Sequence, residues 1–397
     1  MKLLIVNDGA GDGGGVETYL RSVASSLSAL GHEVVFGYCV GEPSGIAPHV
    51  SRCIRLDART ERLVPSGAEN DGFNICFSHN MRFLEVERLL LRRCPVVKFM
   101  HGYFGTCVSG LKSTSLGQIQ TCQRRFSARC LAHYFVRGCG QRTLGACFGG
   151  YRWAREQHRL LSQYAAVLVA SEHMRREYTR HGVPPTRITS IPLFGDPPAS
   201  APAVRPPKAA HTDPKGGHRL VFIGRMTALK GPQLLAKAVM VAMRKLGRKI
   251  QMDFIGDGPL LTPCKVAART DGIDGVFHGW LEGEAKWKAL DGACGLVIPS
   301  LWPEPFGLVG LECARFGIPC AAFDVGGISE WLHDGANGVL AKSDPPTAES
   351  MGNAIVSLIG DESKWQSFRS GATQMASDYT LDRHVRRLLS VLEQARG

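Results

Sequence analysis

The sequence has no long uninterrupted apolar run. Its first residues, MKLLIV, place only four consecutive apolar residues after one lysine. Such a run is too short for the apolar region of a signal peptide and far short of the roughly 20 residues that span a bilayer. We therefore expect a cytoplasmic protein, and we expect its 13 cysteines to be mostly reduced.

Acidic residues are scarce in one quarter of the chain. Residues 81–180 contain 17 Lys and Arg, five Glu and no Asp, an excess of +12 (17 − 5) that equals the net charge of the whole chain. Such a segment can face nucleic acid, an anionic membrane surface or a phosphorylated substrate, or it can be an ordinary solvated surface. We expect no nucleic-acid partner, because no nucleic-acid-binding module is recognisable.

The length of 397 residues exceeds one ordinary domain core. Short apolar runs alternate with segments of helical period, which is typical of a parallel sheet wound with helices. The runs form two sets, so the sequence predicts an α/β fold of two Rossmann-like, doubly wound domains that face each other across a cleft. The first set is 3–6, 34–38, 75–77, 96–99, 166–170 and 188–191, and the second is 220–223, 252–255, 275–277, 296–298, 320–323 and 338–340.

The two sets are separated by a proline-rich stretch with six prolines between Gly195 and Gly217. Its composition predicts a semi-extended linker. We therefore expect a first domain over 1–195, a linker over 196–217 and a second domain over 218–375. The last segment, 376–397, has apolar residues on one helical stripe and is expected to cap a domain or to cross back over the linker.

The first predicted strand ends in a glycine-rich loop, NDGAGDGGGVETYL, in which Gly9, Gly11 and Gly14 fit G-x-G-x-x-G. Glycine lets backbone N–H groups approach an anion at a helix N-terminus, so a phosphate-facing loop is favoured over a plain tight turn. A dinucleotide site would also need an acid near the end of the second strand. That strand ends in YCV, which makes NAD the weakest interpretation.

Two basic residues follow the first strand of the second domain, HRLVFIGRMTALKG. Arg225 and Lys230 are expected to project from one strand-to-helix loop, where charge-assisted hydrogen bonds would hold a pyrophosphate. Two unrelated surface cations are the alternative.

Two glutamates stand eight positions apart in SLWPEPFGLVGLECARFG. Pro303 and Pro305 disfavour helix for the residues before them, so Glu304 is expected in a loop at a strand's carboxyl end. A helix then begins near Gly307, with Glu312 about two turns in. Free N–H groups at a helix N-terminus suit a phosphate, and two carboxylates suit sugar hydroxyls, so the stretch predicts a sugar-nucleotide site.

The segment EPFGLVGLE resembles the E-x7-E element of the retaining GT-B glycosyltransferases of family 4, the group 1 family. Arg225 and Lys230 resemble the diphosphate clamp of that family, and the glycine loop at Gly14 and Gly15 resembles its N-terminal loop. Two longer stretches, SEHMRREYTRHGVPPTRITSIP and FDVGGISEWLHDGANGVLA, are also similar. The resemblance covers most of the chain apart from 106–150.

The resemblance implies a nucleotide-diphosphate-sugar donor held chiefly by the second domain and an acceptor held by the first. Glu304 would bind hydroxyls of the donor sugar and Glu312 the ribose. Arg225 and Lys230 would neutralise charge on the departing diphosphate. Further backbone N–H groups for the donor would come from Phe306, Gly307, Leu308, Gly14 and Gly15.

A histidine at the end of a first-domain strand, His101 in VVKFMHGYFG, matches the histidine of the family that approaches the donor sugar. A satisfied structural histidine is the alternative. His79 in CFSHN also stands at a strand end and carries less weight.

No Asp-x-Asp pair occurs anywhere in the sequence. We therefore expect no metal cofactor, with the basic clamp in place of a chelated metal. The resemblance also implies front-face attack assisted by the leaving phosphate, so Glu304 is not expected to be half of a glycosidase pair.

The insertion at 106–150 contains five cysteines and six basic residues but no acids. Gaps of seven to fourteen residues separate the cysteines, whereas zinc usually takes a close pair. A structural metal and an ordered acceptor-side insertion without metal both stay open. Its arginines would suit an anionic membrane surface, at the inner face of the membrane, or a lipid-diphosphate acceptor: Arg124, Arg125, Arg129, Arg137 and Arg142.

The sequence therefore predicts a retaining glycosyltransferase that moves a hexose from a nucleotide-diphosphate-sugar to a glycan or lipid-linked acceptor. Synthesis of a surface polysaccharide, lipopolysaccharide or glycolipid is the expected setting. A sugar-nucleotide epimerase or a phosphorylase on the same architecture is the alternative, because a fold does not fix a function.

Overall fold

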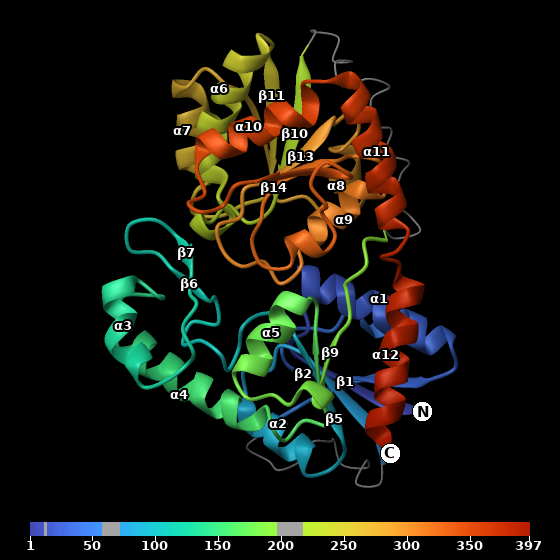
Figure 1. The fold of residues 1–397 in the computed structure, drawn as a ribbon. Coiled ribbons are helices and arrows are strands. Elements are labelled where there is room, and N and C mark those ends of the chain that lie inside the picture. The colour runs from blue at the N-terminus through green and yellow to red at the C-terminus, as the bar shows by residue number, and fades with distance from the viewer. Residues whose placement is uncertain (12–13, 58–71, 197–216) are drawn as a thin grey trace. The chain divides into compact units, whose positions relative to one another are not determined.

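The structure is a computed structural model that describes residues 1–11, 14–57, 72–196 and 217–397. The chain divides into two compact units (Figure 1). Unit 1 comprises residues 1–116, 122–192 and 381–397, and unit 2 comprises residues 117–121 and 193–380. The predicted linker over 196–217 lies, apart from its two end residues, outside the described residues.

Unit 1 contains a parallel sheet in the order β3-β2-β1-β4-β5-β8-β9. All six strands predicted for the first domain are confirmed. The short strand β3 was missed because RCIR has only one buried residue, Ile54, and so shows no apolar run. The strands are β1 (Lys2–Gly9), β2 (Glu33–Val40), β3 (Arg52–Arg55), β4 (Ile75–Ser78), β5 (Val96–Met100), β8 (Ala166–Val169) and β9 (Ile188–Ser190).

Helices cover both faces of this sheet (Figure 1), with α1 and α12 on one side and α2, α4 and α5 on the other. The C-terminal helix α12 belongs to unit 1, and its predicted apolar stripe is buried at Val385, Leu388 and Leu392. The helices are α1 (Gly15–Ala29), α2 (Leu84–Leu91), α3 (Arg129–Arg137), α4 (Leu144–Leu160), α5 (Glu172–Arg180) and α12 (Leu381–Arg396).

Unit 2 contains a second parallel sheet in the order β12-β11-β10-β13-β14-β15, and its six predicted strands are confirmed. Its larger apolar core includes Phe222, Phe254 and Trp365. The strands are β10 (His218–Ile223), β11 (Ile250–Ile255), β12 (Asp274–Gly279), β13 (Gly295–Ile298), β14 (Cys320–Phe323) and β15 (Gly338–Ala341). The helices are α6 (Leu235–Leu246), α7 (Leu261–Thr270), α8 (Gly283–Lys288), α9 (Leu308–Ala314), α10 (Ala348–Ile359) and α11 (Glu362–Ala376).

The doubly wound α/β architecture predicted for both halves is thereby confirmed. Each sheet has one place where the strand order reverses, between β1 and β4 in unit 1 and between β10 and β13 in unit 2. Ligands of such sheets bind outside the carboxyl ends of the strands at this point. The loops after these four strands are therefore where functional side chains are expected.

Helix α9 packs directly on an indole ring. Trp331 is 1% exposed, and its Nε1 donates a hydrogen bond of 2.6 Å to the carbonyl oxygen of Phe306. A Cβ atom on Gly310 of α9 would lie 2.0 Å from Cη2 of Trp331. Glycine is therefore required where the helix meets the ring.

We expect Gly310→Ala to lower the melting temperature of unit 2, because the added methyl group overpacks the site at a cost of about 2 kcal/mol. Thermal denaturation would measure it. Gly149→Ala is the matched control: it lies inside α4 with nothing within 4 Å of the added Cβ, and alanine should stabilise the helix by about 0.5–1 kcal/mol. Equal melting temperatures for the two variants would contradict this account of the packing.

Candidate functional site

The loops after β10 and β13 bring Lys230 and Glu304 together. Lys230 Nζ donates a hydrogen bond of 2.6 Å to Glu304 Oε1, and Ser300 Oγ donates one of 2.5 Å to the same oxygen. Glu304 is only 4% exposed. The sequence predicted the lysine and the glutamate separately, whereas Ser300 was missed because a serine in a loop gives no signal of its own.

The backbone of Glu304 is fixed by two glycines of the segment after β14. Gly327 N–H donates a hydrogen bond of 2.8 Å to the Glu304 carbonyl oxygen. Gly326 has a φ of +67°, and a Cβ there would lie 2.2 Å from that oxygen. The close approach of one backbone to the other holds the carboxylate in one position.

Lys230 has two partners in unit 2. Besides Glu304, its ammonium lies 5.3 Å from the ring centroid of Trp302, a favourable cation–π distance. The neighbouring Gly231 allows the loop to pass the β13 end, because a Cβ there would lie 1.8 Å from the carbonyl oxygen of Pro299. The lysine is thus held beside the carboxylate.

Arg225 differs from Lys230 because its guanidinium is not paired with an acidic residue among those that the structure describes. It follows β10 directly and is exposed, and its guanidinium forms no hydrogen bond or ion pair with any other residue that the structure describes. The two cations predicted for one loop therefore have different surroundings. Arg225 can accept a new anion without breaking an existing pair.

Glu312 lies in α9, where it is the fifth residue. The prediction of two turns was wrong: the helix begins at Leu308, after Gly307 in the left-handed region at φ 85°, so Glu312 is just over one turn in. Its Oε2 accepts a hydrogen bond of 2.7 Å from Lys286 Nζ of α8. No pattern in the sequence singles out Lys286, which is one of two lysines in GEAKWK.

In unit 1, the two strand-end histidines touch. His79 follows β4 and His101 follows β5, and His79 Nδ1 lies 2.9 Å from His101 Nε2. The His101 ring stacks on Phe99 with centroids 4.7 Å apart. From the sequence, His79 carried less weight than His101 as a functional residue, yet His79 is the direct hydrogen-bond partner of His101.

Two residues of this cluster were missed by sequence reasoning. Tyr19 of α1 lies with its OH 2.8 Å from His384 Nε2 of α12, and the Tyr19 ring packs edge-on against His101 at 5.5 Å. His384 Nδ1 lies 2.7 Å from the carbonyl oxygen of Pro192, which can only accept. The His384 proton is therefore on Nδ1, and Nε2 accepts from the tyrosine hydroxyl.

Burial keeps all three imidazoles neutral. Desolvation lowers the pKa of His101 to about 3 and that of His384 to about 4. It also lowers the pKa of His79 well below its usual value, and repulsion from the positive charge of Lys98 adds to this. Lys98 is itself buried in a pair with Glu87 at 2.5 Å. The cluster is uncharged at neutral pH.

The hydrogen bonds also assign the tautomer of His101. His79 is 0% exposed, and its Nε2 has no hydrogen-bond partner within the described ranges of the chain. An unpaired buried N–H group is rarer in proteins than an unpaired acceptor, so Nε2 is the bare nitrogen and Nδ1 carries the proton. His79 then donates to His101 Nε2, which places the His101 proton on Nδ1.

The glycine loop after β1 is described in part, because residues 12–13 lie outside the described residues. Gly14 precedes α1 with a φ of 125°, and Gly15 is the first residue of the helix. A Cβ on Gly14 would lie 2.4 Å from Glu17 Oε2. A carboxylate therefore lies at this helix N-terminus, and a role of the glycines in binding a donor stays a prediction.

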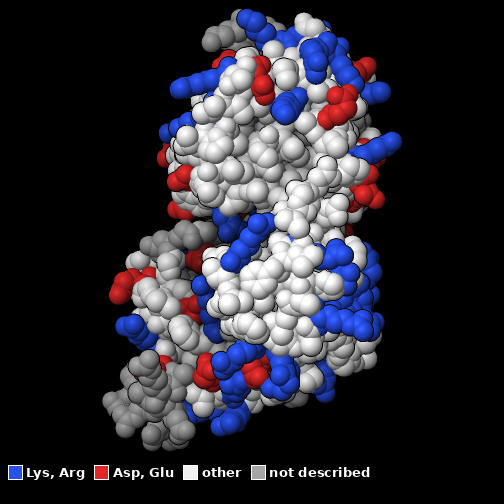
Figure 2. All heavy atoms as spheres, turned by 90° about the vertical axis from the view of Figure 1, so that its left-hand side faces the viewer, with Lys and Arg blue, Asp and Glu red and all other residues white. Residues whose placement is uncertain are grey.

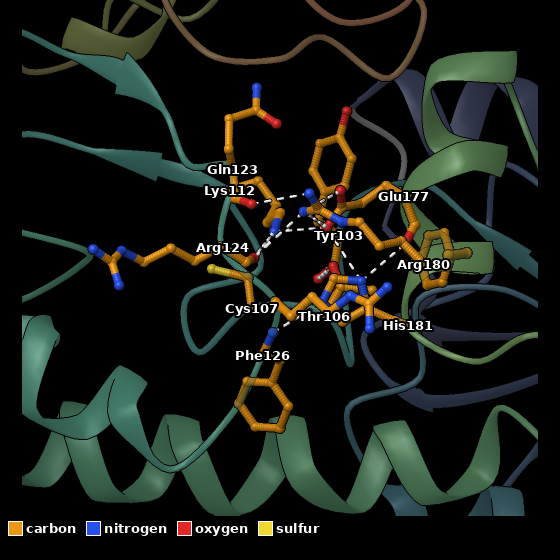
Figure 3. A network of polar contacts seen from close by, with 12 residues as sticks. Tyr103, Thr106, Cys107, Lys112, Gln123, Arg124, Phe126, Glu177, Arg180 and His181 are labelled. Atoms are coloured by element: carbon orange, nitrogen blue, oxygen red, sulfur yellow. Dashed lines mark hydrogen bonds and ion pairs between the residues drawn. The ribbon is translucent and has the colours of Figure 1, made fainter.

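The insertion is attached to α5 by a polar network (Figure 3). Lys112 Nζ pairs with Glu177 at 2.6 Å and donates to the Arg124 carbonyl oxygen at 2.5 Å. On α5, Arg180 pairs with Glu177 at 2.8 Å. Beyond the end of α5, His181 Nε2 accepts a hydrogen bond of 2.9 Å from the Phe126 N–H. Lys112 is 3% exposed, so the insertion is anchored through a buried ion pair.

The cysteines of the insertion are free thiols. Within the described parts of the chain, no group of three or more His, Cys, Asp or Glu residues could hold a metal ion. Among the described helices, none is both long and apolar enough to cross a membrane.

Family models match both halves of the chain. The model described as "Glycosyl transferases group 1" matches residues 217–361, and the model described as "Glycosyl transferase 4-like domain" matches residues 14–193. The chain is a group 1 glycosyltransferase of the family 4 type. The resemblance inferred from EPFGLVGLE and the basic loop is thereby confirmed at the level of the family.

Two relatives of this glycosyltransferase match most of its length. A D-inositol 3-phosphate glycosyltransferase of Arthrobacter sp. is 28% identical over 84% of this chain and 79% of that protein. One of Corynebacterium kroppenstedtii is 26% identical over 98% of this chain and 87% of that protein.

Solved structures share the fold of this glycosyltransferase. HepE of Anabaena, in complex with UDP and glucose, has a TM-score of 0.71 and 17% identity, covering 99% of both chains. Sucrose-phosphate synthase of Thermosynechococcus elongatus has a TM-score of 0.70 and 17% identity, also covering 99% of both chains. The glycosyltransferase therefore has the GT-B fold, and the epimerase or phosphorylase alternative is not favoured.

We expect unit 1 to lose stability as the pH falls. The folded-state pKa of His101, about 3, lies below the usual 6.5. The unfolded chain therefore binds the proton first, and stability is lost from about pH 6.5 downward. His101→Gln should flatten the fall of melting temperature with pH. His49→Gln, at a half-buried position outside this cluster, is the control and should keep the slope. An unchanged slope in His101→Gln would contradict the buried neutral cluster.

Proposed function

We propose that this glycosyltransferase moves a hexose from a nucleotide-diphosphate-sugar to a glycan or lipid-linked acceptor with retention of anomeric configuration. The observation that carries the proposal is the buried carboxylate of Glu304, held by Lys230 and Ser300 where the strand order of unit 2 reverses, with the open charge of Arg225 in the same loop region. The HepE complexes with UDP, glucose and UDP-glucose support a donor of this class.

In this proposal Glu304 binds hydroxyl groups of the donor sugar. Lys230 and Ser300 occupy Oε1, whereas Oε2 has no hydrogen bond to any residue in the part of the chain that the structure describes. Oε2 is thus available to accept from a hydroxyl, while the other oxygen keeps the carboxylate in place. Such a charge-assisted bond contributes about 1.5–3 kcal/mol.

The diphosphate of the donor is assigned to Arg225 and Lys230. Arg225 would supply a charge that is unpaired before binding, and Lys230 would share its charge between Glu304 and the leaving phosphate. Backbone N–H groups of Phe306, Gly307 and Leu308 at the start of α9 are assigned to the donor as well. Stabilising the charge that develops on the leaving group is the main catalytic effect we propose here.

Glu312 is assigned to the ribose of the donor. Lys286 holds one of its oxygens at 2.7 Å, which orients the carboxylate and leaves the second oxygen for a ribose hydroxyl. Lys286 is itself positioned over the ring of Trp287, 4.6 Å from the centroid.

His101 is assigned to a hydroxyl of the donor sugar. With its proton on Nδ1, it would donate a hydrogen bond through Nδ1 while His79 holds Nε2. Gly14 and Gly15 are assigned to the donor as backbone groups of the adjacent loop after β1. Because the imidazole is neutral, it would act through a hydrogen bond and not as a cation.

We propose front-face attack by the acceptor hydroxyl, whose proton passes to the leaving phosphate, without a protein carboxylate as nucleophile and without a metal ion. A cytoplasmic enzyme at the inner face of the membrane, acting in surface polysaccharide, lipopolysaccharide or glycolipid synthesis, is the proposed setting. The basic, acid-poor region of unit 1 supports contact with an anionic membrane.

A panel of UDP-, GDP- and ADP-sugars should include one that raises the melting temperature of the protein. A ligand at a hundred times its dissociation constant stabilises by about 2.7 kcal/mol. Arg225→Ala and Glu304→Ala should each weaken binding roughly 10- to 150-fold, because each removes a charge-assisted bond. Lys237→Ala, an exposed cation on α6, is the matched control. The donor site is refuted if no sugar nucleotide stabilises the protein or if all three variants respond alike.

The glycosidic product should keep the anomeric configuration of the donor, because leaving and attacking groups use the same face of the sugar. Nuclear magnetic resonance of the product formed in the presence of EDTA would measure both the configuration and the metal independence. An inverted product would refute front-face attack. Activity abolished by EDTA and restored by a divalent cation would refute metal independence.

A further inference from the structure

The insertion exposes large apolar side chains at an unusual density. In the described residues eleven large hydrophobic side chains are exposed, and five of them lie within 116–148. Isolated exposed apolar residues are normal, whereas a cluster marks an interaction surface. The five, with their exposed fractions, are Leu116 (54%), Phe135 (37%), Val136 (67%), Leu144 (67%) and Phe148 (55%).

These side chains lie outside the small apolar core of the insertion. A separate cluster of Val108, Tyr134 and Cys147 forms the small apolar core against which α3 and α4 pack. The five exposed residues are not members of that cluster. Phe135 packs edge-on against Tyr134 with ring centroids 5.3 Å apart, and all five keep apolar surface exposed for contact with a partner.

Several of them are neighbours. Leu116 N–H donates a hydrogen bond of 3.2 Å to the Arg137 carbonyl oxygen, which places Leu116 beside the C-terminal end of α3, where Val136 lies. Leu144 and Phe148 are four residues apart in α4 and therefore share one side of that helix.

The charged side chains in this stretch of the sequence have one sign. Residues 88–155 contain no Asp or Glu, and exposed arginines lie among the apolar residues at Arg125, Arg129, Arg137 and Arg142. Figure 2 looks onto the side where α3 and α4 lie in Figure 1 and shows more blue than red side chains around a broad white surface on unit 1. Apolar residues interleaved with arginines match the headgroup and acyl boundary of an anionic bilayer.

The surface is presented on an anchored element. The pair of Lys112 and Glu177, and the bond from Phe126 to His181, hold the chain that leads into α3 against α5 (Figure 3). A bilayer contact through α3 and α4 would therefore position the whole of unit 1 rather than a loose loop.

We propose that the C-terminal end of α3, the first two turns of α4 and Leu116 form a surface that docks on an anionic lipid bilayer. The inference rests on the proposed function, whose membrane contact it assigns to particular side chains. The apolar side chains would enter the acyl boundary, and Arg137 and Arg142 would lie at the level of the lipid phosphates.

Co-sedimentation with vesicles tests this proposal. The full chain should bind vesicles of equal parts phosphatidylcholine and phosphatidylglycerol and bind phosphatidylcholine alone much more weakly. The double variant Arg137→Gln/Arg142→Gln should lose roughly 30-fold in affinity for the anionic vesicles, from about 1 kcal/mol per arginine. Leu144→Ser/Phe148→Ser should lose at least as much.

The matched control is Val266→Ser/Trp280→Ser in unit 2, which changes side chains that are 57% and 52% exposed and should keep full binding. The proposal would be overturned if all variants bound the anionic vesicles equally or if the unaltered chain did not bind them. It would also be overturned if the variants lost self-association of the protein but kept vesicle binding. Melting curves with the sugar-nucleotide panel separate the two proposals. Variants that lose vesicle binding should keep their donor response, and absence of any donor response with intact vesicle binding would refute only the donor site.

Discussion

The buried carboxylate of Glu304 is the interaction on which the arrangement of unit 2 depends. An ionised carboxylate that is 4% exposed is costly unless it is paired and hydrogen-bonded. Lys230 and Ser300 supply these partners from two different loops, and Gly327 fixes the backbone of the glutamate. The loops after β10, β13 and β14 thus all meet at Glu304, two at its side chain and one at its backbone, so a change at any of them would alter the position of the group proposed to hold the donor sugar.

Unit 1 has a buried histidine cluster beyond the ends of β4 and β5. Three imidazoles and a tyrosine are buried there without net charge, and desolvation lowers the pKa of each histidine. Two separate sets of hydrogen bonds fix the positions of the protons. The Pro192 carbonyl oxygen fixes the proton of His384 on Nδ1. His79 Nε2 has no hydrogen-bond partner among the residues that the structure describes, and this fixes the proton of His101 on Nδ1. The two units therefore differ at these places, with paired and open charges in unit 2 and neutral hydrogen-bonding groups in unit 1.

The insertion has a buried ion pair on its inner side and an exposed basic and apolar surface on its outer side. Its attachment to α5 uses a buried ion pair, Lys112 with Glu177, because an anchor inside the protein can satisfy both charges. Its outer surface carries arginines without acidic partners in the same stretch of sequence together with exposed apolar side chains. The inner side of the insertion thus has paired charges, whereas its outer side has arginines without nearby acids in the sequence and exposed apolar side chains.

The sequence by itself determined the strands of both sheets, the glycine loop, the order of the basic loop and EPFGLVGLE, and the family. These features are local: apolar runs, turn residues and motif spacing are properties of short segments. The strand β3 was not predicted because a single buried residue produces no apolar pattern. The position of Glu312 along α9 was predicted wrongly because the helix begins only after Gly307. Only the tertiary structure decided that Lys230 and Ser300 share one oxygen of Glu304, that Lys286 holds Glu312, and that Tyr19 and His384 join His79 and His101. Such contacts join residues up to 365 positions apart, and no local pattern encodes which of many polar side chains will meet once the sheets have formed.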